Sequence, residues 1–153
     1  ITFGSSIPGT ILKFAIDASN TIVAQKGAFL ASSHSVNFET FFQHKALAGF
    51  FGGEGFIMQK FTGNGMLFVE IDGSVVEYTL EPGQSMLIDT GYLAAMESTV
   101  SISVDKVKGI GNALFGGEGL FNTKVTGPGR IWLQTMPANV LADAIKPFIP
   151  TGN

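Results

Sequence analysis

The sequence predicts an all-β fold made of two tandem repeats, each about 64 residues long, followed by one short helix. The first observation is a motif that occurs twice, as Phe51-Gly52-Gly53-Glu54-Gly55 and Phe115-Gly116-Gly117-Glu118-Gly119, and the distance between the copies defines the repeat length (115 − 51 = 64). The match continues in phase, so that nine of the fifteen positions from Phe51 to Gly65 are identical in the second copy. Identity in a fixed register indicates a tandem duplication.

Short apolar runs between turn residues are the other observation, and they are typical of an all-β sandwich or barrel. The run Thr10–Ile16 places Leu12, Phe14 and Ile16 on one face of a strand. The matching run Ser74–Leu80 places three apolar residues there, Val76, Tyr78 and Leu80. The other expected strands are Thr21–Ala24, Ala28–Ala31, Ser35–Glu39, Phe56–Phe61, Met66–Ile71, Met86–Ile88, Tyr92–Ala95, Thr99–Val104, Leu120–Val125 and Arg130–Thr135.

The repeated motifs are assigned a structural role at turns, because glycine adopts a positive φ without strain and lets backbones approach closely. Two β runs around a glycine-bracketed residue also predict a hairpin in each repeat. Glu54 and Glu118 are expected to accept backbone N–H groups or to pair with lysines; the alternative is a carboxylate pair for acid–base chemistry. The residues assigned to the turns are Gly52, Gly53, Glu54, Gly55, Gly63, Gly65, Gly116, Gly117, Glu118, Gly119, Gly127 and Gly129.

Both ends of the chain carry their own predictions. Ile1–Ser6 aligns with Gly65–Glu70, so we expect it to be a strand left from a preceding unit, and a chain that starts without Met is expected to be a trimmed product. Apolar residues at helical spacing predict an amphipathic helix within Pro137–Ile149, whose apolar face has to dock. The predicted organisation is residues 1–64, residues 65–135, and a helix and tail over 136–153.

The composition favours an oligomer and argues against nucleic-acid binding. Charged residues make up only 14% of the chain, the net charge is −3, and the single arginine, Arg130, lies among scattered lysines. A weakly charged, apolar chain is expected to bury surface in a homo-oligomer, whereas a nucleic-acid site needs a dense basic face. There is no cysteine, and no apolar run long enough to span a bilayer. We expect a cytoplasmic protein, with association to a membrane surface as the alternative.

The sequence offers no set of residues that is typical of an enzyme. His34 and His44 are the only histidines, neither recurs in the other repeat, and no G-x-S-x-G nucleophile motif is present. We therefore expect no catalytic residue, no metal site and no cofactor. The aromatic residues around the first motif are expected to be core or subunit interface; the alternative is an exposed patch that binds a partner protein or a membrane, formed by Phe41, Phe42 and Phe50.

Several segments together resemble the altered inheritance of mitochondria protein 24 (mitochondrial biogenesis) family. They are Gly27-Ala28-Phe29-Leu30-Ala31-Ser32, Pro82-Gly83-Gln84, Asp89-Thr90-Gly91-Tyr92-Leu93-Ala94, Gly116-Gly117-Glu118-Gly119-Leu120-Phe121, Gly127-Pro128-Gly129 and Gln134-Thr135. The resemblance is to a bacterial-type member, and it implies a β unit similar to the tryptophan RNA-binding attenuation protein fold, a short double-stranded β-helix. This unit is usually present three times, whereas this chain holds about two. The resemblance implies no catalytic residues, and likeness of fold to an RNA-binding protein does not transfer that function.

The sequence thus leads to two functional hypotheses. The first is a non-enzymatic, oligomeric β scaffold or interaction protein. The alternative is a small-ligand binding module with sites between repeats or between subunits.

Overall fold

The computed structural model describes residues 2–45, 55–106 and 121–149, and these form mainly β-strands. The elements are β1 (Gly9–Ile16), β2 (Ile22–Gln25), η1 (Lys26–Ala28), β3 (Phe29–Ser32), β4 (Val36–His44), β5 (Phe56–Gly63), β6 (Gly65–Asp72), β7 (Val75–Leu80), β8 (Ser85–Asp89), η3 (Thr90–Tyr92), β9 (Leu93–Glu97), β10 (Ser101–Lys106), β11 (Phe121–Thr126), β12 (Gly129–Gln134), α1 (Ala138–Ile145) and η5 (Lys146–Phe148). The all-β prediction with one short C-terminal helix is confirmed.

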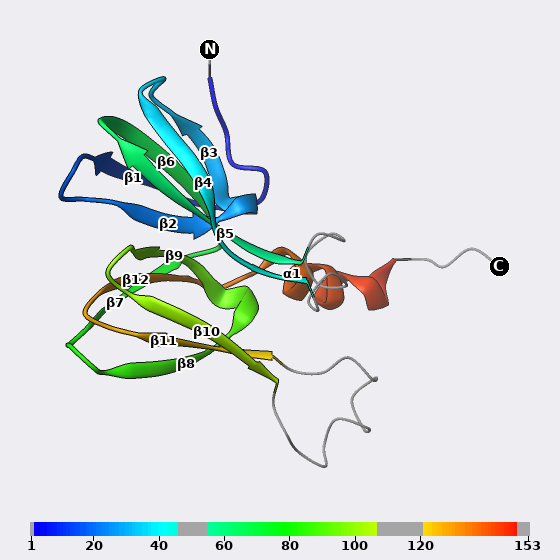
Figure 1. Cartoon of the computed structure of the whole chain (residues 1–153). Helices are drawn as coiled ribbons and strands as arrows, with labels where there is room; N and C mark the ends of the chain where they lie inside the picture. Colours follow the sequence, from blue (N-terminus) through cyan, green and yellow to red (C-terminus); the bar gives the residue numbers. More distant parts are fainter. Residues whose placement is uncertain (1, 46–54, 107–120, 150–153) are drawn as a thin grey trace.

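The strands form three antiparallel sheets. A six-stranded sheet has the order β4-β5-β2-β9-β12-β7, and two three-stranded sheets have the orders β1-β6-β3 and β10-β11-β8. Figure 1 shows the strands of residues 9–72, the N-terminal half, gathered on one side, and those of residues 75–134, the C-terminal half, on the other. The two halves are joined within the six-stranded sheet, where β2 pairs with β9.

Strand registers within the N-terminal half recur in the C-terminal half one repeat length later. Ile22 pairs with Phe61 between β2 and β5, and Met86 pairs with Val125 between β8 and β11 (22 + 64 = 86; 61 + 64 = 125). The β3–β6 and β9–β12 pairs also share their register, including a shift at the same place in each. The strand pairs compared here therefore follow the same pattern in the two halves.

Two clusters of buried apolar side chains form the core, and β2 contributes to both. Ile22 and Ala24 belong to the first cluster and Val23 to the second, and all three are fully buried. Successive side chains of a strand point to opposite faces of a sheet. An uninterrupted apolar run is therefore what a strand with a core on each face requires. Phe14 and Trp132 meet edge to face in the first cluster, with ring centroids 4.7 Å apart.

The two predicted hairpins are wrong, because consecutive strands enter different sheets. β5 pairs with β2 and β4 in the six-stranded sheet, whereas β6 pairs with β1 and β3. The same holds for β11 and β12. Gly63, with φ +115°, turns the chain at this corner, and a Cβ atom there would overlap the carbonyl oxygen of Ser35. The glycines at this corner thus connect two sheets rather than two neighbouring strands.

Three other expectations differ from the structure. Strand β4 continues to His44, beyond the end of the expected strand Ser35–Glu39. Residues 2–6 of the expected strand Ile1–Ser6 are not a strand, and the Ser6 backbone N–H donates to the Glu70 carboxylate rather than to a neighbouring strand. On β7, Leu80 is buried but Val76 and Tyr78 are exposed, because no described element covers that part of the edge strand.

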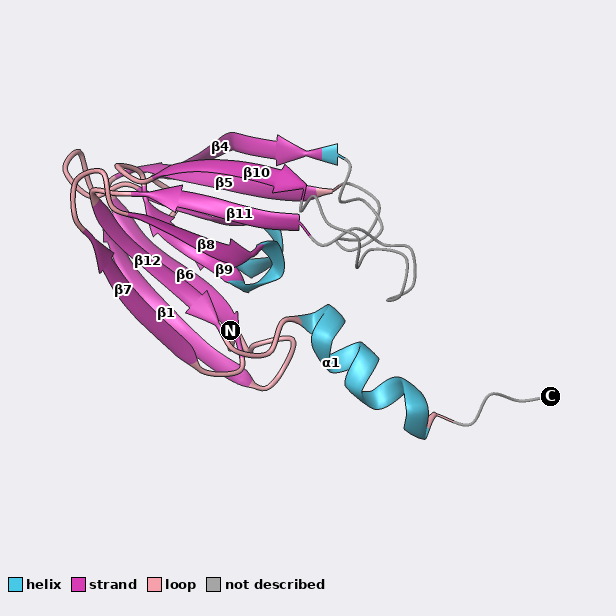
Figure 2. Ribbon diagram, turned by 90° about the horizontal axis from the view of Figure 1, so that it is seen from below, coloured by secondary structure: helices cyan, strands magenta, loops and turns pink. Residues whose placement is uncertain are grey.

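The C-terminal helix α1 leads away from the strands, as Figure 2 shows. None of its residues is buried, and Ile145 at its end and Phe148 in the following η5 are exposed. The expected docking of its apolar face therefore does not occur within the described structure. No helix in the described part of the chain is long and apolar enough to cross a membrane.

Replacing Gly63 by alanine should destabilise the protein, because a positive φ and contact with the Ser35 carbonyl oppose a side chain there. We expect the free energy of unfolding, measured by urea denaturation, to fall by about 1–3 kcal/mol. Gly27→Ala is the matched control, since nothing lies within 4 Å of a Cβ at that position, and it should change stability by less than about 0.5 kcal/mol. Equal effects of the two substitutions would contradict the assignment of the corner.

Candidate functional site

A cavity of about 520 Å³ lies where the two halves meet the start of α1. The N-terminal half contributes Gln25 at the end of β2, Lys26 in η1, and Glu70 and Asp72 at the end of β6. The C-terminal half contributes Gly91 and Gln134, and they are joined by Pro137 and by Ala138 and Asn139 at the start of α1. Its position between halves matches the hypothesis of a binding site between repeats.

Two carboxylates from β6 line the cavity, and each binds a segment outside the sheets. Glu70 is buried and accepts hydrogen bonds from the backbone N–H (2.7 Å) and the hydroxyl (3.2 Å) of Ser6. Asp72 accepts a hydrogen bond from the backbone N–H of Ala138 at 3.1 Å. The end of β6 therefore attaches both the N-terminal segment and the start of α1 around the cavity.

The environment of Asp72 disfavours its charged form. Partial burial raises the pKa of this carboxyl, the N–H of Ala138 opposes the shift, and the nearby Glu70 carboxylate adds to it. Asp17, in an exposed turn, shows the opposite behaviour. Hydrogen bonds from the Ser19 hydroxyl and backbone N–H lower the pKa of the Asp17 carboxyl.

Amide side chains connect the two halves beside the cavity. Gln134 on β12 donates to the carbonyl oxygen of Gly91 at 2.8 Å and accepts from the backbone N–H of Asp72 at 3.2 Å. Gln25 on β2 donates to the carbonyl oxygen of Leu93 at 2.6 Å. Two of these bonds join the halves, Gln134 with Asp72 and Gln25 with Leu93, while the bond from Gln134 to Gly91 lies within the C-terminal half. Together they satisfy backbone groups beside the cavity.

The chemistry of the cavity suits reversible binding of a small polar molecule. Its lining combines carboxylates, amides and Lys26 with apolar groups such as Phe56 and Ile57, a combination typical of ligand sites. Among the residues that the structure describes, no group of three or more His, Cys, Asp or Glu side chains could hold a metal ion. His34 and His44 are not among the described lining residues.

Two strand edges form a second candidate site. β3 ends the sheet β1-β6-β3 and β8 ends the sheet β10-β11-β8, so within the described residues each has a strand on one side only. Phe29 on β3 is 37% exposed and Leu87 on β8 is 65% exposed. Open edges with unpaired backbone groups and exposed apolar side chains can add a strand from another chain.

Two residues of the aromatic patch suggested by the sequence, Phe41 and Phe42, differ in their exposure to solvent. Phe41 is the extra residue where the β4–β5 register shifts, and its side chain is exposed. Phe42 is half-buried and packs against Phe56, with ring centroids 6.3 Å apart. Phe50 lies outside the described residues. Phe38 forms a different exposed aromatic group with Phe29, at a centroid distance of 6.1 Å.

Most of the repeated glycine motif lies outside the described residues, namely Gly52, Gly53, Glu54, Gly116, Gly117, Glu118 and Gly119. Gly55 is described, with φ +87°, and a Cβ there would lie 2.5 Å from the carbonyl oxygen of His44. Gly65 and Gly127 leave no room for a side chain beside Ser33 and Leu80 respectively, and Gly129 has φ +138°. At each of these described positions a positive φ or a close neighbouring atom therefore disfavours a side chain.

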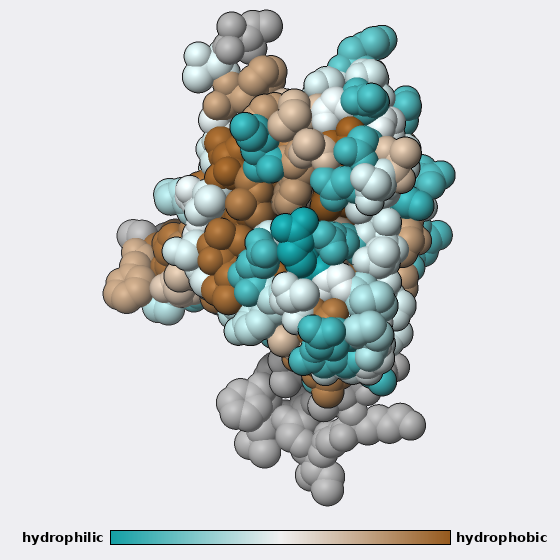
Figure 3. Space-filling model, turned by 90° about the vertical axis from the view of Figure 1, so that its left-hand side faces the viewer, coloured by the Kyte–Doolittle hydropathy of each residue, from teal (hydrophilic) through white to brown (hydrophobic). Residues whose placement is uncertain are grey.

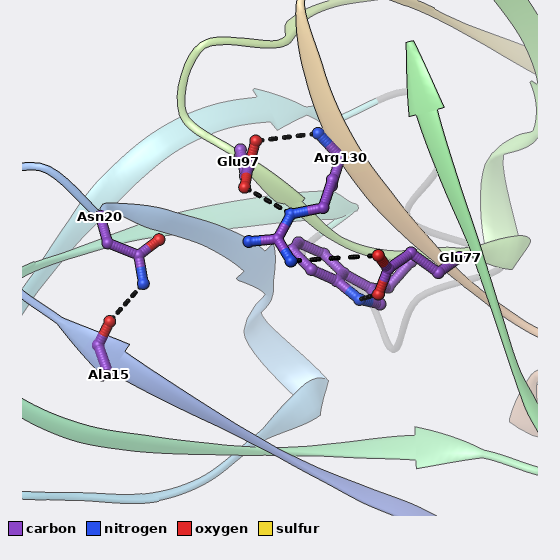
Figure 4. A network of polar contacts seen from close by, with 6 residues as sticks. Ala15, Asn20, Glu77, Glu97 and Arg130 are labelled. Atoms are coloured by element: carbon purple, nitrogen blue, oxygen red, sulfur yellow. Dashed lines mark hydrogen bonds and ion pairs between the residues drawn. The ribbon is translucent and has the colours of Figure 1, made fainter.

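Sequence analysis missed a polar network around Arg130, the only arginine in the chain. Its Nε donates to Glu97 at 2.7 Å, and its guanidinium lies 3.9 Å from the Glu77 carboxylate (Figure 4). The guanidinium carbon is 5.2 Å from the ring centroid of Trp132, whose indole N–H donates to Glu77. Figure 4 also draws the hydrogen bond from the Asn20 amide to the carbonyl oxygen of Ala15. The spacing of Arg130 and Trp132, two residues apart in a strand, was the signal that could have revealed the network.

The family model described as mitochondrial biogenesis AIM24 matches residues 1–136. The chain belongs to the AIM24 family. The expected resemblance is thereby confirmed at the level of the family.

Two streptococcal proteins are similar to this AIM24 chain. It is 29% identical over 127 residues to the uncharacterised protein M6_Spy0233 of Streptococcus pyogenes serotype M6, covering 83% of this chain and 50% of that protein. The chain thus spans half the length of this curated relative. The crystal structure of the protein SPYM3_0169 of Streptococcus pyogenes superposes with a TM-score of 0.76 at 24% identity, covering 94% of this chain and 62% of that one. This likeness shows a shared fold.

Asp72→Asn should stabilise the protein at neutral pH, because the folded environment raises the pKa of this carboxyl above its ordinary value of 3.8. Ionisation of Asp72 therefore opposes folding above its folded pKa and has no effect below about 3.8, where the carboxyl is protonated in both states. We expect a higher melting temperature for the variant at pH 7, and equality with the parent protein at low pH.

Asp17→Asn is the control, because we expect it to change the melting temperature in the opposite direction. Its carboxyl has a lowered pKa in the folded protein, so its ionised form favours folding and the substitution should lower the melting temperature at pH 7. This loss should disappear as the pH falls through the folded pKa of Asp17. Shifts of the same sign in both variants would contradict the assignment.

Proposed function

We propose that this chain is a non-enzymatic interaction protein that works by assembling with further copies of itself. The observation that supports this proposal is the pair of open strand edges, β3 and β8, with exposed Phe29 and Leu87. Proteins usually protect such edges, because an exposed apolar edge recruits other strands. If these edges pair with strands of another copy, that pairing explains both the open edges and their exposed apolar side chains.

The wider surface agrees with self-assembly. Figure 3 shows hydrophobic side chains in patches among hydrophilic ones on one face of the molecule. Exposed apolar residues also occur in η5, which follows α1, where Phe148 is 83% exposed. With only 14% charged residues, the chain has few groups that would oppose burial of these patches between copies.

The proposal includes two finer features from the sequence. The two halves are interpreted as repeats of one double-stranded β-helix unit similar to the tryptophan RNA-binding attenuation protein fold, and the recurring registers support this interpretation. The protein is proposed to act in the bacterial cytoplasm. Its partner is another copy of the chain rather than a nucleic acid, because the basic residues do not gather into a dense patch in the sequence.

Small-ligand binding is the second candidate function, and the cavity between the halves supports it. Its volume of about 520 Å³ falls in the range of small-molecule sites. The lining offers carboxylate and amide groups that can fix the orientation of a polar ligand beside an apolar wall. A ligand bound in this cavity would contact residues of both halves and of α1.

A native mass spectrum of the purified chain at neutral pH tests both candidates. Self-assembly predicts species at whole multiples of the 16.1 kDa chain mass, with larger species more abundant at higher protein concentration. A monomer at every concentration would rule out self-assembly. Ligand binding predicts a reproducible excess mass per chain that denaturation releases, and an unchanged mass in protein taken directly from cells would count against it.

A further inference from the structure

We infer that the cavity between the two halves binds a small organic cation, a molecule in which a protonated amine or a similar group adjoins an apolar portion. This inference rests on ligand binding, the second candidate function, and specifies the class of ligand. Glu70 and Asp72 line the cavity from the end of β6. Since residues two apart on a strand point to the same face, both carboxylates are available to one positive group.

The described lining of the cavity carries more negative than positive charge. Its charged residues are Glu70, Asp72 and Lys26, which together give a net charge of −1 (−2 + 1 = −1). The ion pairs found within the described part of the chain involve Arg130, and none of them includes Glu70 or Asp72. Neither carboxylate is therefore neutralised by a lysine or arginine of the described structure.

Glu70 is held in a buried position by uncharged donors. It is only 9% exposed, and its two oxygens accept hydrogen bonds from the backbone N–H of Ser6 at 2.7 Å and from the Ser6 hydroxyl at 3.2 Å. Buried charges are ordinarily paired with an opposite charge, because uncharged donors replace only part of the hydration that a carboxylate loses. A positive ligand would supply that opposite charge.

The surroundings of Asp72 favour a cation over an anion. Burial and the Glu70 carboxylate both raise the pKa of the Asp72 carboxyl, and the hydrogen bond from the backbone N–H of Ala138 opposes this shift without cancelling it. A bound ammonium group would stabilise the ionised carboxylate, whereas a bound anion would add a further repulsion.

The fold does not require a carboxylate at the position of Glu70. Ser6, Glu70 and Gln134 are equivalent residues one repeat length apart (6 + 64 = 70; 70 + 64 = 134), and all three line the cavity. Gln134 joins its surroundings without a charge, since its amide donates to the carbonyl oxygen of Gly91 and accepts from the backbone N–H of Asp72. Because an uncharged side chain connects the backbone at the equivalent place, the charge of Glu70 is left for a ligand.

The same contrast holds for Asp72. Its equivalents one repeat length before and after it are Pro8 and Met136, which are both uncharged (8 + 64 = 72; 72 + 64 = 136). The two acidic residues of the described lining therefore both come from β6. This arrangement concentrates the negative charge at one part of the cavity wall and gives a positive group a defined place.

The rest of the lining suits an organic cation rather than a metal ion. Ile7, Phe56 and Ile57 add apolar surface to a cavity of about 520 Å³. Within the described residues no group of three or more His, Cys, Asp or Glu side chains could hold a metal ion. An amine with a short apolar tail can donate hydrogen bonds to the carboxylates and place its tail on the apolar surface.

Three probes of equal length test the charge of the ligand, namely hexylamine, hexanol and hexanoate. Each is titrated into the purified chain at neutral pH, and binding is followed by isothermal titration calorimetry and by NMR shifts of the backbone amides. We expect hexylamine to bind about tenfold more tightly than the other two, with shifts centred on Asp72 and Ala138. Equal or tighter binding of hexanol or hexanoate in the cavity would overturn the inferred cation while ligand binding stood.

Substitutions at the two carboxylates locate the bound amine. Glu70→Gln and Asp72→Asn each remove one charge with little change of shape, so each should weaken hexylamine binding by about tenfold and leave hexanol binding unchanged. Because Asp72→Asn is expected to raise the melting temperature, its loss of binding would not reflect unfolding. Glu81→Gln is the matched control, since Glu81 is exposed and is not among the described lining residues, and it should leave the affinity unchanged. Equal effects of all three substitutions would contradict the inferred site.

The native mass spectrum separates this inference from ligand binding itself. Where denaturation releases an excess mass, we expect the released molecule to be a base. Release of an acidic or neutral molecule would overturn the inferred class while ligand binding stood. Failure of all three probes, together with an unchanged mass in protein taken directly from cells, would overturn both.

Discussion

The pairing of β2 with β9 is the contact on which the rest of the molecule depends. It joins the two halves into one six-stranded sheet, and its three residue pairs place fully buried Ile22 and Val23 in different core clusters. Burying side chains of this kind contributes about 1.5–3 kcal/mol each. The hydrogen bond from Gln25 to Leu93 extends the junction to the cavity wall. A cavity between the halves exists because these strands meet.

Local pattern predicted the strands well, because alternation of apolar residues reflects only the faces of one strand. It could not predict the sheets. A glycine-bracketed residue between two β runs fits a hairpin and also fits a corner, and contact of Gly63 with the distant Ser35 decides between them. Likewise, the exposure of Val76 and Tyr78 depends on whether another element covers β7, which the strand's own sequence does not encode.

For the candidate sites too, the sequence predicted local features but not contacts between distant segments. Gln25, Glu70 and Gln134 line one cavity although they lie far apart in the sequence, so no spacing pattern could bring them together before the topology was known. The low charged fraction led us to expect contact between copies, an expectation that stays a prediction. Finding that β3 and β8 are edge strands required the strand order of each sheet.

In this chain one half contributes β2 and the other contributes β9, and the pairing of these two strands joins the halves. Within the described residues the equivalent strands β8 and β3 have a neighbour on one side only. The edge strands β1, β4 and β7 carry a charged residue at an interior position, namely Lys13, Glu39 and Glu77, whereas β3 carries none and β8 carries only its terminal Asp89. Charged edges discourage strand addition, so a strand added to the described sheets is expected at β3 or β8 rather than at those three edges.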